Sequence, residues 1–434
     1  MPEIIPFRGL TYSAAKVRDA TKVVAPPYDV ISPDQQNELY DRSPYNIARV
    51  DFSRDPNPYE SVPPLFQQWQ RDGALVAEDS PAIYYVSQKY ELPGGVHKER
   101  RGFIALAKIE DFTNGKIHGH EATLAEPKED RLKLMLACDA QLSSIFALYA
   151  QEEPILTQTL ADHVTGRKPR HEVPYGEYGV SRLWPVTDPE LIQLVQNSMA
   201  DEPVFIADGH HRYEAAANYR SRRRSEKPGA TGAEGFNYVM MFFANLREDG
   251  VVILPTHRLV HELPKIPFQK LEEDLQRYFH IEPFPKNSDG RQAFLRTLES
   301  HSGKRRALGA SFQGDPRYLL LRLKNKRTMQ TLAKDVCPQL RDLDVSTLHM
   351  LLMEHILGVS TRAAVNTKTV SYDHNADRAL QEVEDGHCKA AFILNPPTAD
   401  QMIQLSLTGE KMPQKSTYFF PKLLTGLVIN KVEV

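Results

Sequence analysis

The sequence predicts a mixed α/β fold built as two regions. Short apolar runs of strand length, such as 238–245, alternate with amphipathic stretches of helix length, such as 188–199. Thirty-one prolines are dispersed along the chain, which indicates many stiff loops between elements. The length of 434 residues exceeds what one hydrophobic core usually supports. We therefore expect an N-terminal α/β region over 1–265 and a C-terminal α/β region over 266–434.

The N-terminal region opens with proline-rich segments and then turns to regular elements. Residues before proline are held in extended conformations, so 26–30 and 43–46 are expected to be structured loops. Ser32 before Pro33 is a typical start for a short helix. Apolar periodicity then predicts helices over 35–40, 59–73, 130–140 and 188–199, and strands over 82–86, 101–109 and 144–150, with a turn at Pro93-Gly94-Gly95 between the first two strands.

The same alternation continues from residue 204 to the end of the chain. A short apolar strand over 204–207 meets a polar string and then a helix over 213–224. The segment 225–235 is rich in glycine, which predicts a flexible loop. Beyond it we expect a buried strand over 238–245, helices over 268–279 and 346–357, and strands over 304–311, 318–323 and 390–394.

Composition argues against several classes of protein. A net charge of −3 argues against general binding to nucleic acid or to a membrane surface, because both need a basic field. No apolar run approaches the ~18 residues of a membrane span, and the first residues lack the features of a signal peptide. Cys138, Cys337 and Cys388 lie too far apart to indicate a disulfide framework or a zinc site. We expect a cytoplasmic protein whose partner is a small molecule.

The sharpest chemical signal is the string Asp208-Gly209-His210-His211-Arg212 between a predicted strand and a predicted helix. Glycine allows a tight turn there, and the helix start presents N–H groups and a positive dipole end that suit an anion. Arg212 can grip a phosphate with two hydrogen bonds, and the histidines can donate or shuttle protons. In the alternative interpretation, Asp208 and the histidines only cap the turn. Chelation of a metal by both histidines is disfavoured, because adjacent side chains diverge.

A second candidate cluster runs over residues 118–131. Glu121 can act as a general base, and Lys128 and Arg131 can hold the charge of a phosphate. The spacing alone favours the alternative, which is a helix start held by salt bridges, with acidic residues of the first turn meeting the helix dipole.

Three further segments each allow two interpretations. Near the C-terminus, 409–422 is either a loop that contacts phosphate or substrate, or a packed terminal strand. Residues 26–30 form either a rigid turn or one wall of a site. The basic run 220–224 is expected at the solvated end of a helix, with binding to nucleic acid as the weaker alternative.

These strings follow one another in an order that is typical of one family. They are PPYDVIS (26–32), SPYNIARV (43–50), HEATL with KEDRL (120–132), FIADGHHRYEAA (205–216) and MPQKSTYFFPKLLTGLV (412–428). In them the chain resembles the large prokaryotic family known as domain of unknown function 1015, over essentially its whole length. The DGHHRYEAA and MPxKSTYFxPK patterns are the specific ones.

The strand–DGHHR–helix unit also resembles the phosphate-binding segment of the ParB/sulfiredoxin-like superfamily, which includes kinases of free serine. This resemblance implies a ParB/sulfiredoxin-like nucleotide-binding core, followed by the second, C-terminal α/β region that closes the site. It implies a nucleotide phosphate on the residues 209–212, with Asp208 beside it and an upstream acid that activates the acceptor hydroxyl. We choose Glu121 as that acid, because it stands in a family-specific string before the DGHHR unit.

We therefore expect a phosphotransferase that acts on a small hydroxylated metabolite, with free serine as the first candidate and with ATP or ADP and Mg²⁺ as cofactors. The alternatives are a phosphohydrolase of the same ligand, for example of phosphoserine, and a ParB-like regulator that binds nucleotide or nucleic acid. We assign no residue to direct metal binding. The candidate residues are catalytic Glu121, Asp208, His210 and His211, nucleotide-binding Gly209, Arg212, Lys128, Arg131, Lys415 and Ser416, and substrate-binding Tyr28, Asp29, His120, Tyr418 and Lys422.

Overall fold

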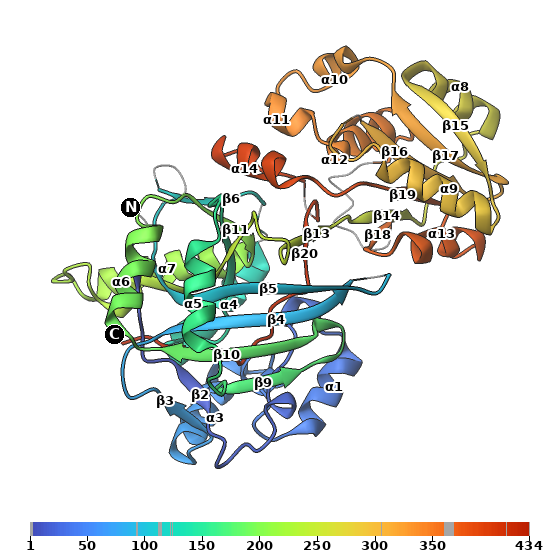
Figure 1. Cartoon of the computed structure of the whole chain (residues 1–434). Coiled ribbons are helices and arrows are strands. Elements are labelled where there is room, and N and C mark those ends of the chain that lie inside the picture. Colours follow the sequence, from blue (N-terminus) through green and yellow to red (C-terminus); the bar gives the residue numbers. More distant parts are fainter. Residues whose placement is uncertain are drawn as a thin grey trace. The chain divides into compact units, whose positions relative to one another are not determined.

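The chain forms two compact units. The computed structural model describes residues 3–92, 94–111, 115–121, 123, 125–304, 306–359, 369–413 and 415–433. The first unit comprises Met1–Gly119, Thr123–Val252 and Phe419–Val434, and the second comprises His120–Ala122 and Ile253–Tyr418. Both contain helices and strands, so the predicted mixed α/β class is confirmed (Figure 1). Apart from the short segment His120–Ala122, the second unit is one stretch of chain from Ile253 to Tyr418, after which the chain returns to the first unit.

The first unit is built on one mixed sheet. Across the sheet the strands follow in the order β6 (Ile117–Gly119), β11 (Val204–Asp208), β8 (Ile145–Tyr149), β12 (Tyr238–Asn245), β5 (Val96–Lys108), β4 (Ile83–Leu92), β10 (Val180–Val186) and β9 (His171–Pro174), and β1 (Ile4–Ile5) pairs with β5. β11 runs parallel to β6 and antiparallel to β8. β4 and β5 form the expected antiparallel hairpin. Pro93 of its predicted turn lies outside the described residues.

The helices of the first unit bury apolar side chains in two clusters. These helices are α1 (Pro33–Arg42), α2 (Ala48–Asp51), α3 (Pro58–Arg71), α4 (Ala125–Cys138), α5 (Ile155–Val164), α6 (Pro189–Met199) and α7 (His210–Glu226). Leu160, Val195 and Tyr219, from α5, α6 and α7, join alternate residues of the strands in one buried cluster. A second cluster gathers α1, α2 and α3 around Trp69. Two short pairs complete the unit, β2 (Leu10–Tyr12) with β3 (Leu75–Ala77) and β7 (Ala140–Gln141) with β21 (Asn430–Lys431).

The C-terminal segment packs against residues on the other side of these strands. The Phe419 ring contacts the ring of Phe146 in β8, with 5.6 Å between their centroids. Leu424 and Leu427 line a small cavity together with side chains of β4, β5 and β12. Backbone bridges tie Thr425 to Ala25 in the N-terminal part of the chain. From Phe419 onward, the chain therefore packs as part of the first unit.

The second unit is built on an antiparallel sheet. Its strands follow in the order β15 (Phe279–Pro285), β17 (Arg317–Leu323), β16 (Ala307–Phe312), β19 (Ala390–Ile393), β14 (His257–Val260) and β18 (Val370–Asp373). The helices are α8 (Phe268–Tyr278), α9 (Ser288–Glu299), α10 (Lys326–Leu332), α11 (Pro338–Arg341), α12 (Asp344–Ser346), α13 (Ala376–Glu384) and α14 (Ala399–Leu407). Phe294 of α9 and Leu380 of α13 pack with Leu320 and Ala391 of the sheet in a common core.

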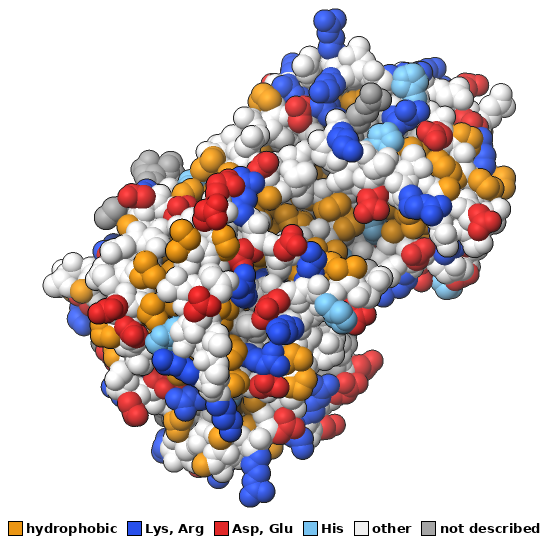
Figure 2. Space-filling view, in the orientation of Figure 1, with side chains coloured by type: hydrophobic (Ala, Val, Ile, Leu, Met, Phe, Trp, Pro, Cys, Tyr) orange, Lys and Arg blue, Asp and Glu red, His pale blue; other side chains and the backbone are white. Residues whose placement is uncertain are grey.

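Two regions refine the expected elements. The apolar helix expected over 346–357 is wound as a π-helix over Thr347–Ile356, and most of its residues are buried. β13 (Val252–Leu254) and β20 (Tyr418–Phe420) contain the places where the chain enters and leaves the long segment of the second unit. Basic and acidic side chains are interspersed on the face shown in Figure 2, in keeping with the small net charge. None of the helices in the described residues combines the length and the apolar content that a membrane span needs.

Candidate functional site

The DGHHR string forms the junction between β11 and α7. β11 ends at Asp208, and the helix begins at His210, three residues before the predicted start. Gly209 stands between them with a φ of 95°, a left-handed conformation that favours glycine. A Cβ at this position would also lie 2.9 Å from Nε of Arg212. Glycine therefore allows both the sharp turn and the close approach of the guanidinium group.

The Asp208 carboxylate lies between two cations. Its Oδ2 atom accepts a hydrogen bond of 2.7 Å from Nη2 of Arg212, and its Oδ1 atom accepts one from Nζ of Lys422. The three side chains are only 11–15% exposed. Burial alone would raise the pKa of Asp208, but the charges of Lys422 and Arg212 outweigh it and hold that pKa below its ordinary value. The two cations therefore favour the ionised form of Asp208, and Lys422 is brought to it from a distant part of the sequence.

Arg212 also braces the loop against the start of β8. Its Nη1 atom donates to the backbone oxygen of Ser144 at 2.6 Å and to Oγ of Ser143 at 3.2 Å. Arg212 was expected to bind phosphate, and in this structure both of its Nη atoms contact protein groups. His210 is 4% exposed and adds to the positive charge that acts on Asp208, while His211 is half-buried.

A third cation, Arg100 of β5, lies beneath this cluster. Its Nη2 atom donates to the backbone oxygen of Pro421 at 2.7 Å, and its guanidinium carbon lies 4.6 Å from the centre of the Phe146 ring. Burial lowers the pKa of Arg100 to about 10, and the charge of Asp208 partly offsets this effect. Its Nε and Nη1 atoms have no hydrogen-bond partner within the part of the chain that the structure describes. Positive charge therefore exceeds negative charge around Asp208.

The two basic residues predicted on α4 form ion pairs. Nζ of Lys128 lies 2.9 Å from Oε2 of Glu214 on α7, and that oxygen also accepts a hydrogen bond of 2.8 Å from Thr123. Arg131 is buried and binds Asp51 on α2, with 3.1 Å between Nη1 and Oδ1, as well as its neighbour Asp130. These contacts are the ones expected from a helix start held by salt bridges.

Asp51 is the acidic residue that sequence reasoning missed. Together with Arg131, Arg212 and Ser143 it lines a cavity of about 40 Å³ in the first unit. Burial raises the pKa of Asp51, while Arg131 and Arg212 act in the opposite direction. Asp51 directly follows the family string SPYNIARV, and this position could have marked it as a candidate site residue. Arg100 gave no such signal, because it stands directly before a predicted strand and in none of the quoted strings.

The predicted turn at 26–30 contacts Arg131, one of the residues that line this cavity. The Arg131 guanidinium carbon lies 4.0 Å from the centre of the Tyr28 ring. Burial raises the pKa of Tyr28 to about 12, and the charges that act on it include those of Arg131, Arg212 and Asp29. Asp29 is exposed. This placement matches the interpretation of the turn as one wall of a site.

The remaining candidates meet in the second unit. Nε2 of His120 lies 3.1 Å from Oγ1 of Thr417, and Oε1 of Glu121 accepts a hydrogen bond of 3.4 Å from the backbone N–H of Lys415. The Tyr418 ring stacks on His374, with 3.6 Å between the ring centroids. The structure thus places His120, Glu121, Lys415, Ser416 and Tyr418 in the second unit, and Tyr28, Asp29, Lys128, Arg131, Asp208, Gly209, His210, His211, Arg212 and Lys422 in the first.

The groups around Asp208 suit an anion better than a metal ion. Asp208 already contacts an ammonium and a guanidinium group, so its oxygens are poor ligands for Mg²⁺. Across the described ranges, no group of three or more His, Cys, Asp or Glu side chains could hold a metal ion. Gly209, the start of α7 and the excess of positive side chains fit the phosphate groups of a nucleotide.

Several solved structures resemble this chain at low sequence identity. A conserved hypothetical protein from Pyrococcus furiosus is 13% identical, with a TM-score of 0.33 over 74% of this chain and 92% of that chain. A mutant free serine kinase in complex with ADP is 11% identical, with a TM-score of 0.34 over 73% of this chain and 87% of that chain. SbnI with a C-terminal truncation, from Staphylococcus aureus, is 10% identical, with a TM-score of 0.33 over 74% of this chain and 85% of that chain.

Comparison with curated proteins finds no match. Residues 4–346 match the model of a family described as protein of unknown function (DUF1015). The match contains four of the five strings on which the resemblance rests, including DGHHRYEAA around the Asp208 cluster. The chain therefore belongs to the DUF1015 family.

Proposed function

We propose that the chain is a phosphotransferase that moves a phosphoryl group from ATP or ADP to a small hydroxylated metabolite, with free serine as the first candidate. The observation that carries the proposal is the Asp208 cluster at the start of α7, where Arg212 and Lys422 hold an ionised carboxylate. The resemblance of the DGHHR string to that of free serine kinases supports serine as the acceptor.

Binding of the donor would use groups that are already in place. The first N–H groups of α7 follow a left-handed Gly209, and the helix dipole favours negative charge there. Arg100, Arg212 and Lys422 together carry more positive charge than Asp208 neutralises. Because these cations are buried, their interaction with phosphate oxygens is stronger than it would be in water.

The transfer step needs an in-line acceptor and a base. The acceptor oxygen bonds to the terminal phosphorus, the bond from that phosphorus to the bridging oxygen breaks, and the shortened nucleotide leaves with the electron pair. The hydroxyl proton passes to a carboxylate, for which we propose Glu121. Asp51 and Asp29 are the competing candidates. The charge of Arg212 acts on Asp51, and the charges of Arg212 and Asp29 both act on Tyr28.

The first test measures phosphoserine by mass spectrometry after incubation of the full chain with serine and either ATP or ADP. We expect phosphoserine and an equal amount of shortened nucleotide. Asp208→Asn should lower kcat/KM by about 100-fold, because the site loses its fixed negative charge and the positions of Arg212 and Lys422. Asp201→Asn is the matched control, since Asp201 forms an exposed ion pair with Lys116.

The outcomes separate the candidate reactions. Absence of phosphoserine with both nucleotides, or full activity of the Asp208→Asn variant, would overturn the proposal. Release of phosphate from phosphoserine without nucleotide would instead assign a hydrolase. Among Glu121→Gln, Asp29→Asn and Asp51→Asn, the base is the residue whose replacement lowers kcat and removes the acidic limb of the pH profile while thermal unfolding stays unchanged.

A further inference from the structure

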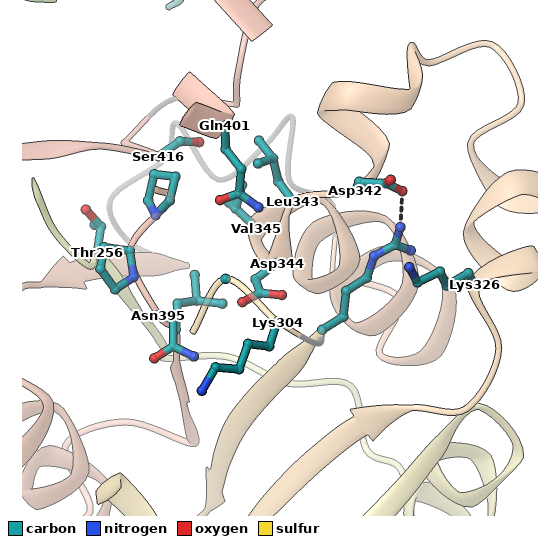
Figure 3. Close-up of a pocket in the computed structure, with 15 residues that line it drawn as sticks. Thr256, Lys304, Lys326, Asp342, Leu343, Asp344, Val345, Asn395, Gln401 and Ser416 are labelled. Atoms are coloured by element: carbon teal, nitrogen blue, oxygen red, sulfur yellow. Dashed lines mark hydrogen bonds and ion pairs between the residues drawn. The ribbon is translucent and has the colours of Figure 1, made fainter. Parts of the chain in front are cut away.

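The second unit contains a cavity of about 240 Å³ to which the proposed phosphotransferase reaction assigns no step. Lys304, Asp344, Asn395 and Gln401 line it and come from four separate segments of the chain, and their side chains gather around one space (Figure 3). Ser416 also lines the cavity. The cavity lies wholly among residues of the second unit.

Positive side chains outnumber negative ones around this cavity. Lys304, Arg306 and Lys326 line it, together with Asp342 and Asp344. Arg306 forms an ion pair with Asp342 through its Nη2 atom (Figure 3). For Lys304 and Lys326, the described ranges of the chain supply no carboxylate within ion-pair distance. Nζ of Lys304 donates a long hydrogen bond of 3.4 Å to the backbone oxygen of Ser300, and the charges of both ammonium groups can still act on an anion in the cavity.

Arg306 shows that the site is built rather than superficial. Its side chain is only 8% exposed, although it lines the cavity. The Nη1 atom is buried and has no hydrogen-bond acceptor among the residues that the structure describes. A buried guanidinium N–H without an acceptor is costly, and such groups are satisfied in most folded proteins. Arg306 therefore adds a fixed, buried positive charge to the wall of the cavity.

Asp344 gives the cavity a titratable wall. Its carboxylate accepts a hydrogen bond from the backbone N–H of Ala307 and lies near Arg306. Burial raises its pKa to about 7, and those two contacts only partly oppose the shift. The charged groups that line the cavity with it are Lys304, Arg306, Lys326 and Asp342. With Asp344 neutral, the side chains around the cavity carry two more positive charges than negative ones.

We propose that this cavity binds a small metabolite through a dianionic phosphoryl group held by Lys304, Arg306 and Lys326. A dianion matches the excess of two positive charges, and a phosphoryl group concentrates both of its charges on oxygens that can accept from several directions. Asn395 and Gln401 offer polar contacts to the rest of the ligand, and Leu343 and Val345 offer apolar ones. This ligand site is independent of the reaction proposed at Asp208.

The test is isothermal titration calorimetry of the full chain with inorganic phosphate, sulfate and succinate. We expect phosphate and sulfate to bind more tightly than succinate. The Lys304→Ala/Lys326→Ala double variant should weaken the binding of sulfate by at least about tenfold, because two charged hydrogen-bond donors are lost. Both lysines are exposed, so the variant is expected to fold. Lys334→Ala, which removes another exposed lysine of the second unit, is the matched control.

The pH dependence of sulfate binding provides a second readout. Sulfate stays doubly charged near neutral pH, so any change in its affinity reports on the protein. Affinity should rise as the pH falls from about 8 to about 6, because protonation of Asp344 removes a negative charge beside the anion. Asp344→Asn should bind sulfate at about pH 8 as tightly as the unmodified chain does at about pH 6.

Three results would overturn this proposal. They are equal sulfate affinity in the double lysine variant and the unmodified chain, tighter binding of succinate than of phosphate, and absence of sulfate binding. Repeating the titration with Arg212→Ala separates the two units, since loss of sulfate binding there would assign the anion to the first unit instead. None of these measurements depends on phosphotransferase activity.

Discussion

Gly209 and Arg212 explain why the turn after β11 carries the residues it does. The glycine adopts a left-handed conformation, and the space where a side chain would stand is taken by the guanidinium group. That group in turn holds Asp208 and the start of β8. The sequence predicts the turn and the anion-binding helix start from local residues alone. It does not predict Lys422 as the partner of Asp208, because the two residues lie 214 positions apart.

Gly209→Ala should destabilise the first unit by about 1–3 kcal/mol and lower any activity that depends on Arg212. The alanine would be strained at a φ of 95°, and its Cβ would press on Nε of Arg212. Gly232→Ala is the matched control, because Gly232 has a φ of 98° and its added Cβ would meet nothing within 4 Å. Urea unfolding of both variants separates the two effects, and equal losses would show that the contact with Arg212 contributes nothing.

Regular elements follow from periodicity wherever a long apolar stripe is present. The strand over Tyr238–Asn245 has the predicted bounds, and the helix Phe268–Tyr278 differs from its prediction by one residue. β18 and β14 were not predicted, since each is only four residues long and mixes polar with apolar residues. The π-helical winding of Thr347–Ile356 was not predicted either, because apolar residues on every side favour burial without selecting a helical pitch.

Helix α3 contains Pro63 and Pro64 in its interior, which local propensity disfavours. Pro64 is exposed, so replacing it removes little packing. Pro64→Ala should therefore raise the free energy of unfolding by about 1–3 kcal/mol, because it restores a backbone donor and relieves the clash of the ring. Circular dichroism during thermal unfolding measures this change. Gln67→Ala, at another exposed position of the same helix, should change little, and an unstable Pro64→Ala variant would contradict the argument.

Tryptophan fluorescence reports on only one of the two units of the molecule. Both tryptophans, Trp69 and Trp184, belong to the first unit, so their fluorescence follows that unit alone. No linker in the sequence marks the bounds of these units. Ile253 begins the long segment of the second unit within a short strand, and Tyr418 ends it within another. The units are defined by contacts between residues that are distant in the sequence, and local sequence patterns do not reveal these contacts.

The first unit should lose stability in mild acid. Burial, with the charge of Arg170, lowers the pKa of His171 from 6.5 to about 4. Between these values the unfolded chain binds a proton that the folded chain does not, so the free energy of unfolding falls as the pH falls. At about pH 5 the loss is on the order of 2 kcal/mol. Urea unfolding followed by tryptophan fluorescence at about pH 7 and pH 5 checks this, and His171→Gln should reduce the difference. An unchanged pH dependence in that variant would refute it.

The return of the C-terminal segment to the first unit sets an order on biosynthesis. Lys422 and β21 leave the ribosome after the second unit, yet Asp208 and β7 need them as partners. The second unit has all its residues before the first unit can be completed. A chain released early, after the second unit, would therefore carry a carboxylate without its ammonium partner and an apolar sheet face without its cover, which proteolytic quality control can recognise. Completion of the anion site therefore requires synthesis to have passed the second unit and reached Lys422.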